Sequence, residues 1–135
     1  MMKVEIPGRG NYELKHLVMD VNGTIAVDGN LKLGVIPRLF NLRDTLQLHL
    51  LTADTHGHQA QINSALGLQA RIITKGAIEK GDFVRELGAE SVVALGNGAN
   101  DVEMFKAASI SIAVMGGEGL SPALLAHADV LVDDV

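Results

Sequence analysis

Cysteine and tryptophan are absent from this sequence of 135 residues, and aromatic residues make up only 3% of it. Without cysteine, the chain can form neither disulfide bonds nor thiolate metal sites. With so few aromatic side chains, a core must be built mainly from Leu, Ile, Val and Ala packed between layers of secondary structure. Apolar residues make up 47% of the chain, enough to fill one core, so we expect a single α/β domain over residues 1–135.

Basic residues are few as well. Lys and Arg number 11 against 16 Asp and Glu, the net charge is −5, and the basic residues form no run. The chain therefore lacks the basic surface that binds nucleic acid or anionic membranes. No apolar run approaches the ~20 residues that cross a bilayer, and Lys3 and Glu5 stand where a signal peptide needs apolar residues. We expect a soluble, cytoplasmic protein.

Short apolar runs that end in polar or turn residues alternate with stretches of helical period. This pattern is typical of β-α units around a parallel sheet. The predicted buried strands are residues 17–19, 46–51, 70–73, 92–95, 110–114 and 130–132. The predicted helices are residues 35–43, 58–66, 77–87, 101–107 and 122–126.

Two hairpins are predicted in addition to the parallel sheet. Residues 4–6 and 12–14 flank a turn that contains Pro7, Gly8 and Gly10, which indicates an N-terminal β-hairpin. A second hairpin is expected over residues 25–33, around its own glycine-containing turn.

Polar clusters follow three of the predicted strands. They are Asp20-Val21-Asn22-Gly23-Thr24, then Thr52-Ala53-Asp54, and then Gly96-Asn97-Gly98-Ala99-Asn100-Asp101. In an open parallel sheet, ligands bind beyond the carboxyl ends of the strands. The three clusters are therefore predicted to converge at one edge of the sheet.

These clusters resemble the motifs of the haloacid dehalogenase superfamily. The first resembles its nucleophile loop, Asp-x-Asp-Gly-Thr, residues 51–54 resemble the Thr-Gly-Asp motif of P-type ATPases, and residues 96–101 resemble Gly-Asp-Gly-x-Asn-Asp. Residues 112–116 and 128–131 continue the P-type pattern in order, so the likeness covers roughly residues 16–135. The chain most resembles the soluble P-type ATPase-like group. That resemblance implies a three-layer, Rossmann-like α/β fold with a central parallel sheet, and chemistry through an aspartyl-phosphate.

The resemblance implies no nucleotide-binding or membrane domain. Only about 30 residues separate Asp20 from Thr52, which is too few for a cap domain of ordinary size. We therefore expect an open site.

Asp20 is the nucleophile that the resemblance implies. A carboxylate at this position can attack phosphorus and divide one difficult hydrolysis into two easier steps. Lys80 resembles the lysine of the superfamily, which balances the negative charge of the nucleophile and the phosphate. Lys75 is the alternative candidate for this lysine.

The phosphate would be bound by two loops. The backbone N–H groups of the Gly23-Thr24 turn are expected to cradle its oxygens, as oriented amides do in nests. Thr52 would offer its hydroxyl, and Ala53 beside it would complete the phosphate-binding set.

A divalent cation is the expected cofactor. The resemblance implies that Asp20, Asn97 and the backbone carbonyl of Asn22 hold Mg²⁺, a hard cation that prefers oxygen ligands. Asp101 is the fourth candidate, placed either to order its loop or to contact metal-bound water.

Two positions depart from the superfamily pattern. Asn22 replaces the aspartate that phosphatases use as general acid and base, and an amide cannot exchange protons in this way, so turnover should be slow. Asn97 replaces the usual aspartate ligand, so the affinity for Mg²⁺ should be lower.

Three further features of the sequence allow other interpretations. Asp54, His56 and His58 could form a transition-metal site, but no further ligand is evident. The glycine-rich residues 115–119 lack the Lys-Ser/Thr of a phosphate-binding loop and are interpreted as a turn. The remaining histidines, His16, His49 and His127, carry no visible partner and are interpreted as structural.

The sequence therefore predicts a Mg²⁺-dependent phosphatase or phosphotransferase that acts on a small phosphorylated compound. The alternative is a phosphate- or metal-binding regulatory protein with little or no turnover. Because a small open domain exposes apolar surface, we also expect a homo-oligomer, in which the N-terminal hairpin or the 25–33 hairpin of a neighbour helps close the site.

Overall fold

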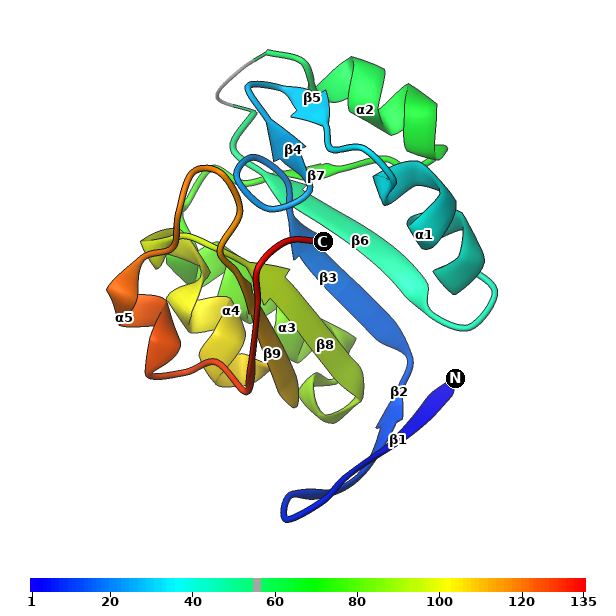
Figure 1. Ribbon diagram of the computed structural model, residues 1–135, viewed down its shortest axis with the longest axis vertical. Coiled ribbons are helices and arrows are strands. Elements are labelled where there is room, and N and C mark those ends of the chain that lie inside the picture. The colour runs from blue at the N-terminus through cyan, green and yellow to red at the C-terminus, as the bar shows by residue number, and fades with distance from the viewer. Residues whose placement is uncertain (55–56) are drawn as a thin grey trace.

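The fold is built on a six-stranded, all-parallel sheet with the strand order β10-β9-β8-β3-β6-β7. The computed structural model describes residues 1–54 and 57–135 and is drawn in Figure 1. In chain order, the strands of the sheet are β3 (His16–Asp20), β6 (Gln47–Thr52), β7 (Arg71–Ile72), β8 (Val92–Gly96), β9 (Ile110–Val114) and β10 (Val130–Val132).

Apolar runs form these strands because both faces of the sheet are covered. Val18 and Met19 in β3 point to opposite faces, and each is fully buried. The prediction of a central parallel sheet is confirmed, with strand ends that differ by at most one residue. β7 is shorter than predicted; it lies at the edge of the sheet and pairs with β6 through only Arg71 and Ile72.

The helices form one layer on each face of the sheet. Val35 of α1 and Ile62 of α2 pack into the same apolar cluster as Met19, whereas Val84 of α3 and Met104 of α4 pack into a second cluster. The helices are α1 (Val35–Leu42), α2 (Gln59–Leu66), α3 (Ala77–Leu87), α4 (Val102–Ala107) and α5 (Pro122–Leu125), with 3-10 turns η1 (Ala89–Ser91) and η2 (Ala99–Asp101).

The two hairpins lie at opposite ends of the sheet (Figure 1). The N-terminal hairpin of β1 (Met2–Ile6) and β2 (Gly10–Leu14) forms a separate antiparallel sheet that leads into the start of β3. The second hairpin, β4 (Ala26–Val27) and β5 (Asn30–Leu31), lies near the carboxyl end of β3. Both hairpins were predicted from sequence, and the second is placed beside the expected site of its own chain.

The topology brings the polar loops together. Because β6 and β8 are the two neighbours of β3, the loops after these three strands share one edge of the sheet. Between β3 and β8, the described residues form only the small β4-β5 hairpin and elements of the sheet layers, so they contain no inserted cap domain. Within residues 1–54 and 57–135, no helix is long and apolar enough to cross a bilayer.

Candidate active site

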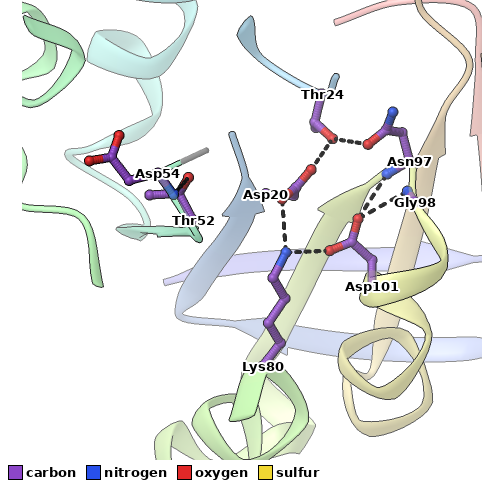
Figure 2. Close-up of polar contacts among 8 residues, drawn as sticks. All are labelled: Asp20, Thr24, Thr52, Asp54, Lys80, Asn97, Gly98 and Asp101. Carbon is purple, nitrogen blue, oxygen red and sulfur yellow. Dashed lines mark hydrogen bonds and ion pairs between the residues drawn. The ribbon is translucent and has the colours of Figure 1, made fainter. Parts of the chain in front are cut away.

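A buried charge cluster stands at the carboxyl end of β3 (Figure 2). Lys80 Nζ lies 2.8 Å from Asp20 Oδ1 and 2.8 Å from Asp101 Oδ1. The three side chains are only 2%, 10% and 0% exposed in the order Lys80, Asp20 and Asp101. One ammonium group is thus shared by two carboxylates. The three side chains together carry more negative than positive charge, and their burial keeps most water away from them.

The pKa values follow from this arrangement. Burial raises the pKa of Asp20 to about 6, the negative charge of Asp101 adds to the rise, and the contacts with Lys80 and Thr24 oppose it. Burial alone would lower the pKa of Lys80, but the charges of Asp101 and Asp20 outweigh it and raise that pKa. Near neutral pH, Lys80 is therefore a cation and Asp20 is a carboxylate.

Close packing of two helices puts Lys80 in this position. Lys80 is in the first turn of α3, and the next residue, Gly81, faces α4: a Cβ atom there would lie 3.1 Å from the backbone oxygen of Glu103. Lys75 is exposed in the loop before α3, where its N–H donates to the Glu79 carboxylate. The structure therefore brings Lys80 to Asp20 and leaves Lys75 outside the cluster.

Asp101 organises the loop after β8. Its Oδ2 accepts hydrogen bonds from the N–H groups of Asn97 and Gly98, each at 3.1 Å. Gly96 makes room for this carboxylate, because a Cβ atom there would lie 2.5 Å from Oδ2. Since Oδ1 is bound to Lys80, both oxygens have protein donors. These bonds are the loop-ordering contacts predicted for Asp101, while its contact with metal-bound water stays a prediction.

The hydroxyl of Thr24 lies between two oxygens of the site. It is 3.1 Å from Asp20 Oδ2 and 3.2 Å from Asn97 Oδ1. A hydroxyl has one proton, so it can donate to only one of these oxygens at a time. The other oxygen keeps its lone pairs available to a cation, which is the donor chemistry that a Mg²⁺ ion requires.

The Gly23-Thr24 turn does not present its amides to a phosphate, and this prediction is wrong. Gly23 N–H donates to the Ala26 carbonyl at 2.7 Å, and Thr24 N–H donates to the Val21 carbonyl at 3.2 Å. These bonds close the tight turn that leads into the β4-β5 hairpin. The two N–H groups can serve either this turn or a phosphate, and the sequence pattern did not reveal which.

Asn22 has the unused polar groups of this loop. Among the described residues, neither its backbone N–H nor its carbonyl takes part in a hydrogen bond, and its buried Oδ1 also has no donor. A buried polar atom without a partner is costly, which indicates that a ligand or water completes this loop. The Asn22 carbonyl has no donor within the described residues, and its use as a cation ligand stays a prediction.

Thr52 presents a hydroxyl proton at the same edge. Its Oγ1 accepts the N–H of Asp54 at 3.0 Å, and no acceptor for its proton is found within the described residues. Figure 2 shows Thr52 and Asp54 to one side of Asp20. The exposed Ala53 lies between them in the chain, and its N–H also has no acceptor among the described residues.

The proposed transition-metal site is not supported by the described part of the chain. His56 lies outside the described residues, and Asp54 Oδ1 accepts the N–H of Gln59 at 3.3 Å. His58 packs closely against Gly29, where a Cβ atom would come within 2.7 Å of the ring. Residues 1–54 and 57–135 contain no cluster of three or more His, Cys, Asp or Glu that could hold a metal.

Two histidines interpreted as partnerless in fact contact each other. His16 Nδ1 and His49 Nε2 lie 3.1 Å apart, on the adjacent strands β3 and β6. Burial lowers the pKa of both rings, that of His49 to about 4. Both rings are thus neutral near pH 7, and one ring donates an N–H to the other. The pair is far apart in sequence, so only strand register reveals it.

The sequence profile of the haloacid dehalogenase-like hydrolase family matches residues 42–135. The matched part contains Thr52, Lys80, Asn97 and Asp101. Asp20 precedes the matched part, and its side chain contacts Lys80, which lies within that part.

Two curated proteins have similar sequences. The phospholipid-transporting ATPase tat-1 of Caenorhabditis elegans is 36% identical over 80 residues, which is 56% of this chain. The chain spans only 7% of the length of that protein. An uncharacterized protein of Methanocaldococcus jannaschii is 46% identical over 39 residues, 29% of this chain and 89% of the relative. The first match agrees with the resemblance to P-type ATPases.

Solved structures share the fold at low sequence identity. A phosphoserine phosphatase in its apo form has a TM-score of 0.73 at 16% identity, covering 90% of this chain and 94% of that chain. The cobalt-bound deoxy-D-mannose-octulosonate 8-phosphate phosphatase of Haemophilus influenzae has a TM-score of 0.67 at 19% identity, covering 90% and 79% of the two chains. With the profile match over most of the chain, these findings show that this protein belongs to the haloacid dehalogenase-like hydrolase family.

Proposed function

We propose that the chain is a Mg²⁺-dependent phosphatase or phosphotransferase that acts on a small phosphorylated compound through an aspartyl-phosphate on Asp20. The observation that carries this proposal is the contact of the buried Lys80 ammonium with Asp20 at the end of β3. A buried cation beside a carboxylate, at the edge where ligands bind, suits a nucleophile that must accept a dianionic group. The named activities of two relatives of the same fold, on phosphoserine and on a sugar-acid phosphate, support the class of substrate.

The reaction would proceed in two displacements. In the first, Asp20 Oδ2 attacks phosphorus, the bond from phosphorus to the leaving oxygen breaks, and the leaving group takes a proton from water. In the second, a water oxygen attacks phosphorus, the bond to Asp20 breaks, and inorganic phosphate is released with the carboxylate restored. Lys80 and the Thr52 hydroxyl would stabilise negative charge in both steps.

The residues present fit a single hard cation. Asp20, Asn97 and the Asn22 carbonyl would hold Mg²⁺, which would offset the charge that gathers when a phosphate approaches two carboxylates. Only one of these three ligands carries a negative charge, so we expect weak binding until the phosphate adds its own oxygens.

Slow turnover is part of the proposal. Asn22 occupies the position of the general acid and base, but its amide can neither give up nor accept a proton near neutral pH. General acid–base catalysis typically contributes about 10²–10⁴-fold, so both displacements should lack this factor. The second step should suffer more, because water needs a base while a good leaving group needs no acid.

A binding function is the second candidate, and the same residue favours it. If Asn22 prevents turnover entirely, the site would still bind phosphate and Mg²⁺, as a regulatory protein does. The two candidates differ in whether a covalent bond forms on Asp20.

Acetyl phosphate distinguishes the phosphatase or phosphotransferase from the binding protein. After incubation with acetyl phosphate and Mg²⁺, intact mass spectrometry of the native chain should detect one added phosphoryl group, which hydroxylamine removes. Asp20→Asn is the matched control and should stay unmodified. An unmodified native protein would favour the binding function.

A further inference from the structure

Glu118 places a carboxylate next to the site, although residues 115–119 were interpreted from their sequence only as a turn. The loop follows β9, which is the neighbour of β8, so it emerges at the same edge of the sheet. A Cβ atom added to Gly23 would overlap Asn97 Nδ2 and would lie 2.6 Å from Glu118 Oε2. The backbone of Gly23, the amide of Asn97 and the carboxylate of Glu118 therefore meet at one point.

This carboxylate has no partner within the described part of the chain. Among the described residues, Glu118 forms neither a salt bridge nor a side-chain hydrogen bond. Lys32 lies beside the same loop, since a Cβ atom on Gly116 would come within 2.9 Å of its Nζ. That ammonium is already paired with Asp134 at 2.8 Å. Glu118 is exposed, and its carboxylate lies beside Gly23 and Asn97 without a described cation as partner.

Asn97 is the position where the site lacks charge. Its Oδ1 shares the Thr24 hydroxyl with Asp20, so it is connected to the nucleophile through one bridging group. The carboxamide brings an oxygen but no negative charge, and hard cations are bound more tightly as the number of charged ligands rises. A carboxylate beside Asn97 can make up this deficit without occupying the same position.

The loop that carries Glu118 also contacts Asn97 directly. Gly116 and Gly119 have φ angles of 58° and 79°, in the left-handed region that glycine adopts without strain. Asn97 Nδ2 donates to the carbonyl of Gly119 at 3.5 Å, so the loop is joined to Asn97 itself. Asn97 is therefore joined by this bond to the residue that follows Glu118 in the chain.

We propose that Glu118 supplies the negative charge toward the divalent cation that Asn97 does not provide. The inference rests on the proposed function, because it concerns the cation of that site. It assigns a role to a residue outside the three motif clusters. It also accounts for an uncharged residue at position 97 in a site that handles phosphate.

Binding of Mn²⁺, followed by electron paramagnetic resonance in the absence of substrate, tests the proposal without any activity measurement. Glu118→Gln should weaken Mn²⁺ binding on the order of tenfold, as the loss of supporting groups around metal sites typically does. Glu86→Gln is the matched control, because Glu86 is exposed on α3 and its loss changes the net charge equally. That variant should bind Mn²⁺ like the native protein.

A second comparison separates a local effect on the cation from a structural one. In an Asn97→Asp background, where the missing charge is restored, Glu118→Gln should cause a smaller fold-change than in the native background. Equal Mn²⁺ affinity of the native and Glu118→Gln proteins, or no Mn²⁺ binding by the native protein, would overturn the role of Glu118. Labelling of Asp20 by acetyl phosphate in the same samples shows separately whether the proposed function holds.

Discussion

Lys80 Nζ lies 2.8 Å from Asp20 Oδ1, although the two residues are 60 positions apart in the chain. Lys80→Met would leave Asp20 and Asp101 buried together without their cation. Removal of one partner from a buried ion pair costs about 3–5 kcal/mol, so the free energy of unfolding in urea at pH 8 should fall by that order. The loss should shrink near pH 5, where Asp20 can take up a proton.

Lys75→Met is the control for this change. Lys75 is exposed and lies outside the cluster, so its substitution should alter stability by no more than about 0.5 kcal/mol. Equal losses for the two variants would show that Lys80 does not neutralise the buried carboxylates.

Asp20→Asn is expected to change how stability depends on pH. The pKa of Asp20 rises from its ordinary 3.8 to about 6 in the folded chain, so the folded state loses stability as the pH rises between these values. An asparagine avoids this loss and keeps a similar volume, while Lys80 retains Asp101. The variant should gain on the order of 2 kcal/mol over the native protein above pH 6, and little near pH 4.

Urea unfolding at a series of pH values measures this difference. Asp44→Asn, at an exposed position, serves as the control and should follow the native curve. A constant difference between Asp20→Asn and native protein over the whole range would contradict the assignment of the shifted pKa to Asp20.

Much of this architecture could be predicted from the sequence. Buried parallel strands read as continuous apolar runs, and the residue after each run falls at the ligand-binding edge. For this reason the sequence alone predicts that Asp20, Thr52 and Asn97 lie near one another. The candidate lysine could be narrowed only to Lys80 or Lys75, because the sequence does not show which of the two side chains packs against the end of β3. In the structure, Lys80 lies in α3 and contacts Asp20, whereas Lys75 is exposed in the loop before α3.

The details that could not be predicted are contacts between distant segments. The amides of Gly23 and Thr24 could serve either a phosphate or their own turn, and motif spacing does not distinguish these uses. The His16–His49 contact depends on the register of two strands. The position of Glu118 near the site could have been predicted, because its loop follows the strand next to β8. A role for its side chain could not, because the glycine-rich segment matches no known ligand-binding motif.

An apolar groove on the surface leads us to expect that copies of the chain associate. The groove has a volume of about 420 Å³ and lies between the N-terminal hairpin, α1 and the sheet. Among its lining residues are Met2, Val4, Ile6 and Ile112, which are half-buried. Because such a surface is costly to expose, we expect self-association, which light scattering measures. A monomer at micromolar concentration, with and without Mg²⁺ and phosphate, would contradict this expectation.

Asn22→Asp should speed hydrolysis of the phosphoenzyme. The new carboxylate can act as general base, and steady-state turnover should rise on the order of 10²-fold, the low end of such effects, because Asn22 Oδ1 is buried and a second charge near Asp20 is costly. Asn30→Asp is the control, since Asn30 is exposed in the β4-β5 hairpin. Steady-state hydrolysis of p-nitrophenyl phosphate at saturating Mg²⁺ measures the gain. If neither variant is faster than the native protein, Asn22 does not limit the second step.

Rapid-mix kinetics of the native protein with p-nitrophenyl phosphate test the central claim most directly. p-Nitrophenolate leaves without a proton, so phosphorylation of Asp20 should be fast and its hydrolysis slow. We predict a burst of about one p-nitrophenolate per chain, followed by a slow steady state, and no burst in Asp20→Asn. A linear release from the first time point, or a burst that survives Asp20→Asn, would contradict a two-step reaction through Asp20.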